Sequence, residues 1–127
     1  MSLKNYLALL VICTAISIFQ VNAKTGVVHC PGGYSKGGGG ATCYESPDEN
    51  GITHACPSDK CGHDGKTWVW MHGCVHYPDG TAIGSEQCTQ YTFLRDNLYV
   101  CTTIHGKTYQ CPHKLSDPSI SCTDCFY

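Results

Sequence analysis

The sequence predicts an all-β fold: a small cysteine-rich protein of short hairpins in two related modules, crosslinked by zinc, by disulfides or by both. Eleven cysteines in 127 residues is the density of a crosslinked scaffold. Aliphatic residues are sparse, with only three leucines after Ala23, so the core is too thin to hold the chain by itself. No segment after Ala23 keeps a 3.6-residue period, whereas turn dipeptides and threonine-, tyrosine- and valine-rich runs recur.

Residues 1–23 have the pattern of a secretory signal peptide. Lys4 supplies the positive charge, Tyr6–Phe19 the apolar run, and Val21-Asn22-Ala23 the small residues before a cleavage site. We therefore expect cleavage before Lys24, which removes Cys13 and leaves ten cysteines. No second apolar run follows, so we expect a secreted product that is released rather than anchored.

Charge excludes two classes of partner. The chain has ten acidic and eight basic residues, and one of the bases is Lys4, so residues 24–127 carry a formal charge of about −3. No basic patch is present to hold nucleic acid, and no basic amphipathic helix is present to hold a membrane surface. We therefore expect neither nucleic acid nor a membrane as a partner. We also expect the protein to be a monomer.

Glycine turns divide the chain into hairpins. Four dipeptides place glycine second in a tight turn: Asn50-Gly51, Asp64-Gly65, Asp79-Gly80 and His105-Gly106. The run after the second of them, residues 66–70, has the composition of a strand. Alternation along it places Trp68 and Trp70 on one face, and Val69 and Met71 on the other, so one of these faces should be buried.

A weak internal repeat indicates two modules. Residues 49–57 align with residues 104–112, and each segment follows a cysteine pair with 12 residues between its members, Cys30 and Cys43 in the first case, Cys88 and Cys101 in the second. We predict cysteine-rich β modules at 24–80 and 81–127, with five cysteines in each. An odd number cannot pair within a module, so a purely disulfide-bonded fold needs at least one bridge between the modules.

Histidines cluster around the cysteines. Six of the seven histidines lie within two residues of a cysteine: His29, His54, His63, His72, His76 and His113. Imidazole beside thiolate is zinc-ligand chemistry, whereas the signal peptide favours disulfides. Both interpretations stay open, as does a mixture of the two.

Three local clusters are the candidate zinc ligands. The second of them alternates on one strand, so its three side chains should share a face, and the third contains a Cys-X2-Cys pair that suits chelation better than a direct bridge. The candidates are Cys56, Cys61 and His63; His72, Cys74 and His76; and Cys111, His113, Cys122 and Cys125. No His-Glu-X-X-His motif accompanies them, so any zinc is expected to be structural.

Catalytic patterns are missing from the sequence. No Gly-X-Ser-X-Gly motif, no paired carboxylates and no cysteine plainly left over as a nucleophile occur. We therefore expect a protein that is not an enzyme and that acts by binding. The hairpin with Trp68, Trp70 and Met71 is the expected contact surface, because aromatic residues dominate interface energetics.

Residues 61–68 resemble a known inhibitor motif. Cys61-Gly62-His63-Asp64-Gly65-Lys66-Thr67-Trp68 is similar to the Cys-Gly-Ser-Asp-Gly-Lys-Thr-Tyr stretch of Kazal-type serine-protease inhibitors. Two spacings depart from that family. Four residues instead of seven separate Cys56 from Cys61, and five instead of three separate Trp68 from Cys74. No inhibitory residue therefore carries over.

The pattern of the whole chain is similar to the cysteine-rich secreted avirulence effectors of rust fungi, some of which are Kazal-like in sequence and some of which are built from zinc-binding β modules. That resemblance implies a secreted virulence or avirulence protein of a plant pathogen. Such a protein acts in or around host cells by binding host proteins and is recognised by a host immune receptor. The alternative is a disulfide-stapled Kazal-like protease inhibitor or toxin that acts outside cells.

Overall fold

The structure is a computed structural model that describes residues 26–48 and 51–126. The signal peptide expected at 1–23 lies outside these residues. The all-β prediction is confirmed, because the described part contains eleven strands and its one helical element is the short 3-10 turn η1 (Ser58–Lys60). The strands are β1 (Val28–His29), β2 (Gly33–Gly37), β3 (Gly40–Tyr44), β4 (Thr53–Pro57), β5 (Cys61–Gly62), β6 (Val69–His76), β7 (Ala82–Cys88), β8 (Gln90–Arg95), β9 (Leu98–Thr102), β10 (Thr108–Pro112) and β11 (Ser121–Cys122).

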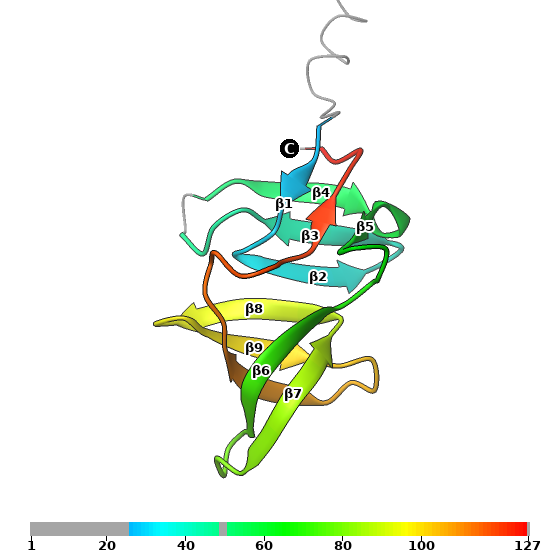
Figure 1. Cartoon of the computed structure of the whole chain (residues 1–127). Helices are drawn as coiled ribbons and strands as arrows, with labels where there is room; N and C mark the ends of the chain where they lie inside the picture. Colours follow the sequence, from blue (N-terminus) through cyan, green and yellow to red (C-terminus); the bar gives the residue numbers. More distant parts are fainter. Residues whose placement is uncertain (1–25, 49–50, 127) are drawn as a thin grey trace, which may run out of the picture.

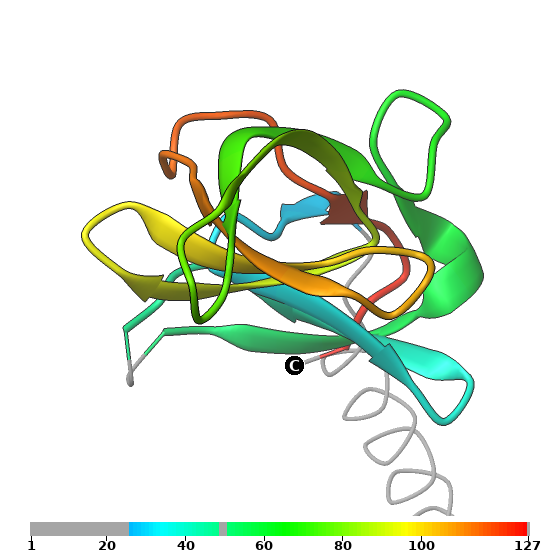
Figure 2. The ribbon, with the colours of Figure 1, turned by 90° about the horizontal axis from the view of Figure 1, so that it is seen from below.

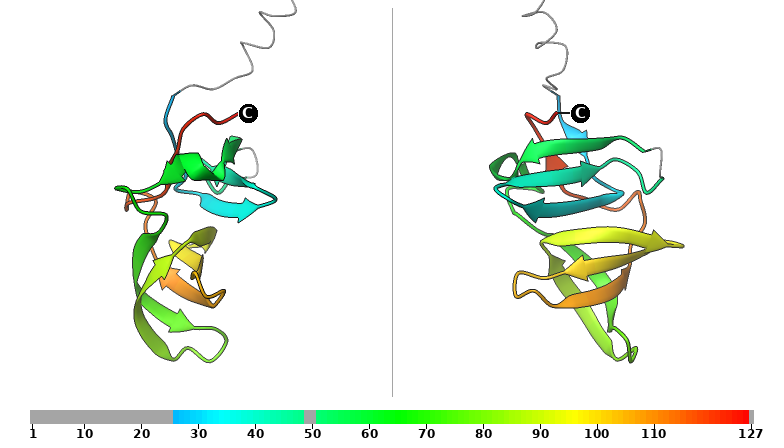
Figure 3. Two further views of the ribbon diagram at one scale, coloured as in Figure 1. Left: turned by 90° about the vertical axis from the view of Figure 1, so that its right-hand side faces the viewer. Right: turned by 180° about the vertical axis from the view of Figure 1, so that it is seen from behind.

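All of the strand pairs are antiparallel. Eight strands form one sheet in the order β4-β3-β2-β8-β9-β10-β6-β7, and three short ones form a second sheet in the order β1-β11-β5. Figure 1 shows the two halves of the large sheet one above the other. The right view of Figure 3 shows the same arrangement from the opposite side. The halves meet where β2 pairs with β8 over two residues, with Tyr34 opposite Tyr91.

The two halves of the large sheet repeat each other. In the upper half, β3 places Cys43 between Tyr34 of β2 and His54 of β4. In the lower half, β9 places Cys101 between Tyr91 of β8 and Tyr109 of β10. Because Tyr34 and Tyr91 are themselves paired across the junction, the two three-stranded meanders are related by an approximate twofold axis between these tyrosines.

The repeat extends to the strands that flank each meander. In the lower half, Met71 of β6 pairs with Glu86, two residues before Cys88. In the upper half, Cys122 of β11 pairs with Val28, two residues before Cys30. The approximate axis therefore equates Met71 with Cys122, and it equates β6 with the last described residues of the chain.

The positions after Met71 and Cys122 also correspond. Gly73 and Asp124 both have a left-handed backbone, with φ of 67° and 59°. Cys74 and Cys125 come next, and each forms a disulfide to the outer strand of its meander, to Cys111 and to Cys56 respectively. We call residues 28–48, 51–62 and 120–126 together the first unit, and the contiguous residues 69–112 the second unit.

The two units are closed differently. In the second unit β6 and β7 fold back over β8, β9 and β10, as Figure 2 and the left view of Figure 3 show. In the first unit the returning chain forms only the two-residue β11 and a single bridge between Phe126 and Ala55, with N···O distances of 2.8 and 2.9 Å. Strand pairing and crosslinks thus join the end of the chain to its beginning.

Five disulfides crosslink the described chain, and they use all ten of its cysteines. Two bridges have the same sequence separation of 13 and lie at equivalent places in the two meanders, Cys30–Cys43 and Cys88–Cys101. The other three are Cys56–Cys125, Cys61–Cys122 and Cys74–Cys111. Each of these three joins the predicted module at 24–80 to the one at 81–127. The boundary between those modules stays a prediction, and it falls in the turn between the paired strands β6 and β7.

The core consists of these sulfur atoms and a small set of large side chains. The largest buried side chains include Tyr34, Tyr91, Tyr99, Met71, Ile120 and Val69. Val69 and Met71 are buried on one face of β6 while Trp70 is exposed on the other, which confirms the expected alternation. Met71 is therefore a core residue, and the expectation that it belongs to a contact surface is wrong.

A bulge in β6 breaks the alternation beyond Met71. The register between β6 and β7 shifts between Met71 and Cys74, and Gly73 at this point has a positive φ. Cys74 therefore lies on the buried side with Met71, whereas His72 is exposed. The expectation that His72, Cys74 and His76 share one face is wrong for Cys74, because the extra residue resets the period of two.

Candidate functional site

One cleft gathers most of the chemically distinctive side chains of the described surface. It has a volume of about 430 Å³. Three segments line it: the exposed face of β6, the hairpin after β5 and the loop after β10. Its lining residues are His63, Asp64, Lys66, Trp68, Val69, Trp70, His72, Pro112, His113, Asp117 and Pro118. We call this cavity the Trp–His cleft.

The exposed face of β6 forms one wall of the cleft. Trp68 and Trp70 pack edge to face, with ring centroids 5.2 Å apart and planes at 85°. Trp70 and His72 are nearly parallel at 11°, with centroids 6.4 Å apart. His72 is fixed by a hydrogen bond of 2.6 Å between its Nδ1 and the Ser85 hydroxyl of β7. The three rings form a row along the strand, and Trp70 remains 46% exposed.

The hairpin after β5 forms the second wall. Asp64 and Gly65 both have positive φ, 49° and 74°, and His63 and Lys66 exchange backbone hydrogen bonds of 2.8 and 2.9 Å around them. These are the marks of a type I′ turn, which the Asp-Gly dipeptide predicts. The ammonium of Lys66 lies 5.0 Å from the centroid of the Trp68 ring, within cation–π range. The hairpin is therefore docked onto the tryptophan row.

The loop after β10 forms the third wall and holds His113. This histidine is buried, with its Nε2 3.0 Å from the carbonyl oxygen of Pro118 and its Nδ1 3.6 Å from a carboxylate oxygen of Asp117. Since a carbonyl only accepts, Nε2 carries a proton and donates it to Pro118. The backbone N–H of Lys114 donates to the same Asp117 oxygen at 2.8 Å, which fixes the carboxylate.

Tyr99 supports His113 from below. Its ring meets the imidazole edge to face, with centroids 5.4 Å apart and planes at 90°. Its hydroxyl donates to the carbonyl of Pro31. Burial, and secondarily the charge of Asp117, raises the pKa of Tyr99 to about 12. The phenol is therefore neutral at physiological pH and serves as a fixed packing and hydrogen-bonding group.

A second cavity adjoins the Trp–His cleft. It has a volume of about 450 Å³ and shares His63, Asp64, Asp117 and Pro118 with the first. It adds His29, from β1, to the lining. Four of the seven histidines of the chain therefore line these two adjoining cavities, together with the carboxyl groups of Asp64 and Asp117.

The predicted zinc ligands separate into two groups. Three of the four histidines, His63, His72 and His113, line the Trp–His cleft, whereas His76 faces Asp79 at the β6–β7 turn with an Nδ1···Oδ1 distance of 3.1 Å. All six cysteines are in disulfides. Among the described residues, each group of three or more potential metal-ligand atoms within 4.8 Å of one another consists of cysteine sulfur atoms alone.

Zinc stays a prediction for these residues. A zinc-bound cysteine is a thiolate, so the six cysteines of the predicted set are ligands only in the reduced chain. Disulfides are formed and kept in oxidising surroundings, which supports an extracellular or otherwise oxidising location.

Some residues of the cleft gave no signal in the sequence. Pro112, Asp117 and Pro118 lie more than forty positions from Trp70, and they reach it because β10 pairs with β6 and Cys74 is bonded to Cys111. Lys66 and Asp64 appeared in the sequence only as parts of a turn. A contact between distant segments cannot be inferred from local spacing.

The Trp–His cleft has the composition of a binding site. Flat apolar rings provide contact area with little loss of conformational entropy, while imidazoles, carboxylates and backbone groups at the rim fix orientation. Among residues 26–48 and 51–126, no helix has the length and hydropathy needed to cross a bilayer. Comparison of the chain with protein-family models, curated proteins and solved structures gives no match.

Proposed function

We propose that this chain is a secreted, non-enzymatic effector protein of the virulence or avirulence type, and that it binds a host protein through the Trp–His cleft. The resemblance of its cysteine pattern to effectors of plant-pathogenic fungi supports the class. The five disulfides suit a protein that meets the oxidising exterior first. A host immune receptor is one kind of protein that would bind such a surface.

The single observation that carries the proposal is the tryptophan row, in which Trp70 is exposed and Trp68 half-buried, on a strand that is held rigidly. Trp70 is 46% exposed although large apolar residues are scarce in this chain. Its strand is fixed by the buried residues Val69 and Met71 and by the Cys74–Cys111 disulfide. A rigid aromatic anchor loses little entropy on binding, which is the property of an interface hot spot.

Direct binding tests the proposal. The secreted chain is used to capture proteins from extracts of host plant tissue, and each captured protein is then purified and titrated against the chain by calorimetry. We expect Trp70→Ala to weaken the affinity by about 30-fold or more, because truncating an aromatic hot spot costs at least ~2 kcal/mol. His72→Ala should have a smaller effect in the same direction.

A matched control separates the cleft from general stickiness. Phe126 is 52% exposed and lies in the first unit, outside the Trp–His cleft. Phe126→Ala should bind like the unaltered chain. Equal losses for Trp70→Ala and Phe126→Ala, or none for Trp70→Ala, would remove the cleft from the proposal.

Protease inhibition is the second candidate, and one observation favours it. The hairpin at 63–66 projects Asp64, whose side chain is 85% exposed, within the stretch that resembles Kazal inhibitors. The turn there contains only two residues, so it offers a protease less extended backbone than the tryptophan row offers a protein partner. Stoichiometric inhibition in a panel of serine proteases, abolished by deletion of residues 64–65 but not by Trp70→Ala, would favour this candidate.

Zinc belongs to the proposal only for a reduced chain. Delivery into host cytosol would expose the disulfides to reducing thiols, and the freed thiolates would then be open to metal. Metal analysis of the reduced, refolded chain tests this part separately. Zinc retained after gel filtration supports it, and a metal-free folded chain contradicts it.

A further inference from the structure

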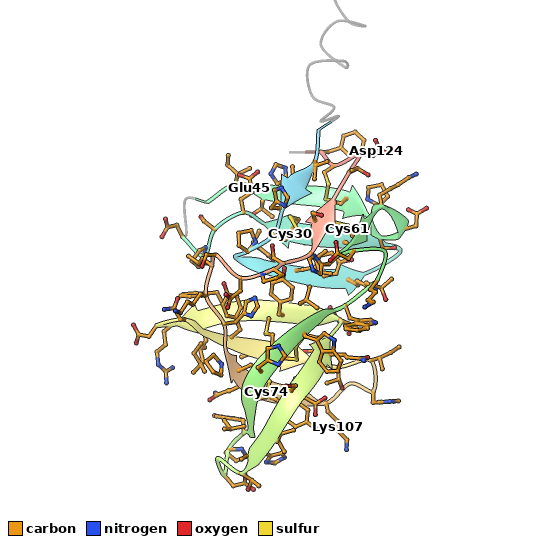
Figure 4. The ribbon with its side chains drawn as sticks, in the orientation of Figure 1. Cys30, Glu45, Cys61, Cys74, Lys107 and Asp124 are labelled. Carbon is orange, nitrogen blue, oxygen red and sulfur yellow. A yellow bond between two sulfur atoms is a disulfide. The ribbon has the colours of Figure 1, made fainter. Side chains whose placement is uncertain are left out.

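The disulfides differ in their access to solvent. Nine of the ten cysteines in the described chain are buried, and Cys61 is the exception, being only partly buried. Its partner Cys122 is 1% exposed. Figure 4 shows Cys30 and Cys61 near each other in the first unit, with Cys74 far below them on β6. An external thiolate therefore meets the disulfide network at Cys61.

Cys122 lies at the centre of a sulfur cluster. Its Sγ is 3.9 Å from the Sγ of Cys30. The sulfur atoms of Cys30, Cys43 and Cys122 lie within 4.8 Å of one another, and so do those of Cys56, Cys61 and Cys122. Three disulfides of the first unit are thus close enough for a thiolate at Cys122 to reach another bridge after a small movement.

We propose that Cys61 is a thiol-modification site and that its modification starts thiol–disulfide exchange through the first unit. An external thiolate, such as glutathione or a reactive cysteine of another protein, attacks the Cys61 sulfur. A new bond forms between the external sulfur and Cys61, the Cys61–Cys122 bond breaks, and Cys122 leaves as a thiolate. Attack occurs at Cys61 rather than at Cys122 because exchange requires access to the sulfur that is attacked.

The second step is internal and needs no further reagent. The Cys122 thiolate attacks Cys30, a Cys30–Cys122 bond forms, the Cys30–Cys43 bond breaks, and Cys43 leaves as a thiolate. The number of disulfides is unchanged in this step, so no electrons are gained or lost. A second external thiolate that attacks the mixed disulfide at Cys61 releases the oxidised external pair and completes a two-electron reduction.

The second unit provides an internal control. Its sulfur atoms are also clustered, with Cys88, Cys101 and Cys111 within 4.8 Å of one another. The position equivalent to Cys122 is Met71, which is fully buried and cannot exchange. All four cysteines of the second unit are buried, so an external thiolate has no access to them in the folded chain.

Mass spectrometry of the folded, secreted chain tests the inference. The protein is exposed to glutathione for increasing times and quenched in acid, free thiols are alkylated at low pH, and peptides are mapped without reduction. We expect the first products to carry glutathione on Cys61 and an alkylated thiol on Cys122 or Cys43, together with a Cys30–Cys122 peptide. The Cys30–Cys43 bridge should be lost at least about tenfold faster than Cys88–Cys101, because opening of the second unit requires unfolding.

A variant isolates the role of the access point. Cys61→Ser together with Cys122→Ala removes the accessible bridge and leaves the other four. In this variant Cys30–Cys43 should become as resistant to glutathione as Cys88–Cys101. Loss of all bridges at one rate in the unaltered chain, or first modification at a cysteine of the second unit, would overturn the inference even if the variant fails to fold.

Discussion

The two units show two ways of fixing the same strand. In the second unit, the strand that contains Met71 is eight residues long and is paired with β7 and β10. In the first unit, the strand that contains Cys122 is two residues long and is paired with β1 and β5. Met71 fixes its strand by packing, whereas Cys122 fixes its strand by a covalent bond to Cys61 directly opposite it. A crosslink thus takes the place of extended strand pairing where the sheet is too short to provide it.

The largest loss of stability should come from the second unit, where packing of Met71 fixes the strand. Met71→Ala removes a fully buried side chain, and truncations of this kind cost about 2 to 5 kcal/mol because a cavity remains. Guanidinium denaturation of the oxidised chain measures the loss. The neighbouring Trp70→Ala, which is on the exposed face, should cost less than half as much, and equal losses would contradict burial as the cause.

Removal of the Cys61–Cys122 crosslink in the first unit should cost less stability than Met71→Ala. Cys61→Ser with Cys122→Ala opens a loop that the Cys56–Cys125 bridge already shortens to residues 56–61 and 122–125. Loop-closure entropy then predicts a loss of about 2 to 3 kcal/mol. The same denaturation experiment checks it, with Cys74→Ser together with Cys111→Ser as the comparison in the second unit. A loss above that for Met71→Ala would reverse the proposed ranking of the two devices.

The paired tyrosines at the junction provide a finer comparison. The Tyr91 hydroxyl donates to the carbonyl of Cys30 at 2.6 Å and accepts the N–H of Ile120 at 3.0 Å, whereas the equivalent hydroxyl of Tyr34 is buried and has no hydrogen-bond partner in the described structure. Tyr91→Phe should therefore cost about 1 to 3 kcal/mol, since it leaves the buried N–H of Ile120 unpaired, whereas the Cys30 carbonyl still accepts the N–H of Gly33 at 3.3 Å. Tyr34→Phe should be neutral or slightly stabilising. Thermal unfolding of the two variants decides between these outcomes.

Alkaline pH should destabilise the chain gradually rather than in one step. Burial raises the pKa of Tyr99 to about 12, and it raises the pKa values of Tyr34 and Tyr91 as well, from an ordinary value of about 10. A raised pKa in the folded state means that the stability from neutral tyrosine is complete below pH 10 and is lost as the pH rises from 10 toward 12. Denaturant midpoints at pH 8, 10 and 11 measure this loss. A midpoint that stays constant to pH 11 would show that these phenols ionise freely.

Local patterns in the sequence predicted local structure well. The Asp64-Gly65 dipeptide predicted its turn, and alternation predicted that Val69 and Trp70 lie on opposite faces of their strand. The equal spacing of Cys30–Cys43 and Cys88–Cys101 reflects equivalent bridges in the two units. These features depend on residues that are neighbours in sequence or that share one hairpin.

Long-range features could not be predicted in the same way. The bulge at Gly73 moved Cys74 away from the face of His72, and one inserted residue leaves no mark in the composition of a strand. The bridges of Cys56, Cys61 and Cys74 depend on where the chain returns after β10. Of the residues that line the Trp–His cleft, the sequence singled out only the tryptophans, as a contact surface, and the histidines, as zinc ligands. The loop that completes the cleft lies far away in sequence.

The return of residues 120–126 to the first unit sets the order of events during biosynthesis. The second unit is contiguous and can close as soon as Pro112 has entered an oxidising compartment. The first unit, although it is synthesised earlier, has to wait for the last residues before Cys56 and Cys122 find their partners. The first unit is therefore completed after the second, although it is synthesised first. A chain truncated before Cys122 would keep unpaired thiols at Cys56 and Cys61.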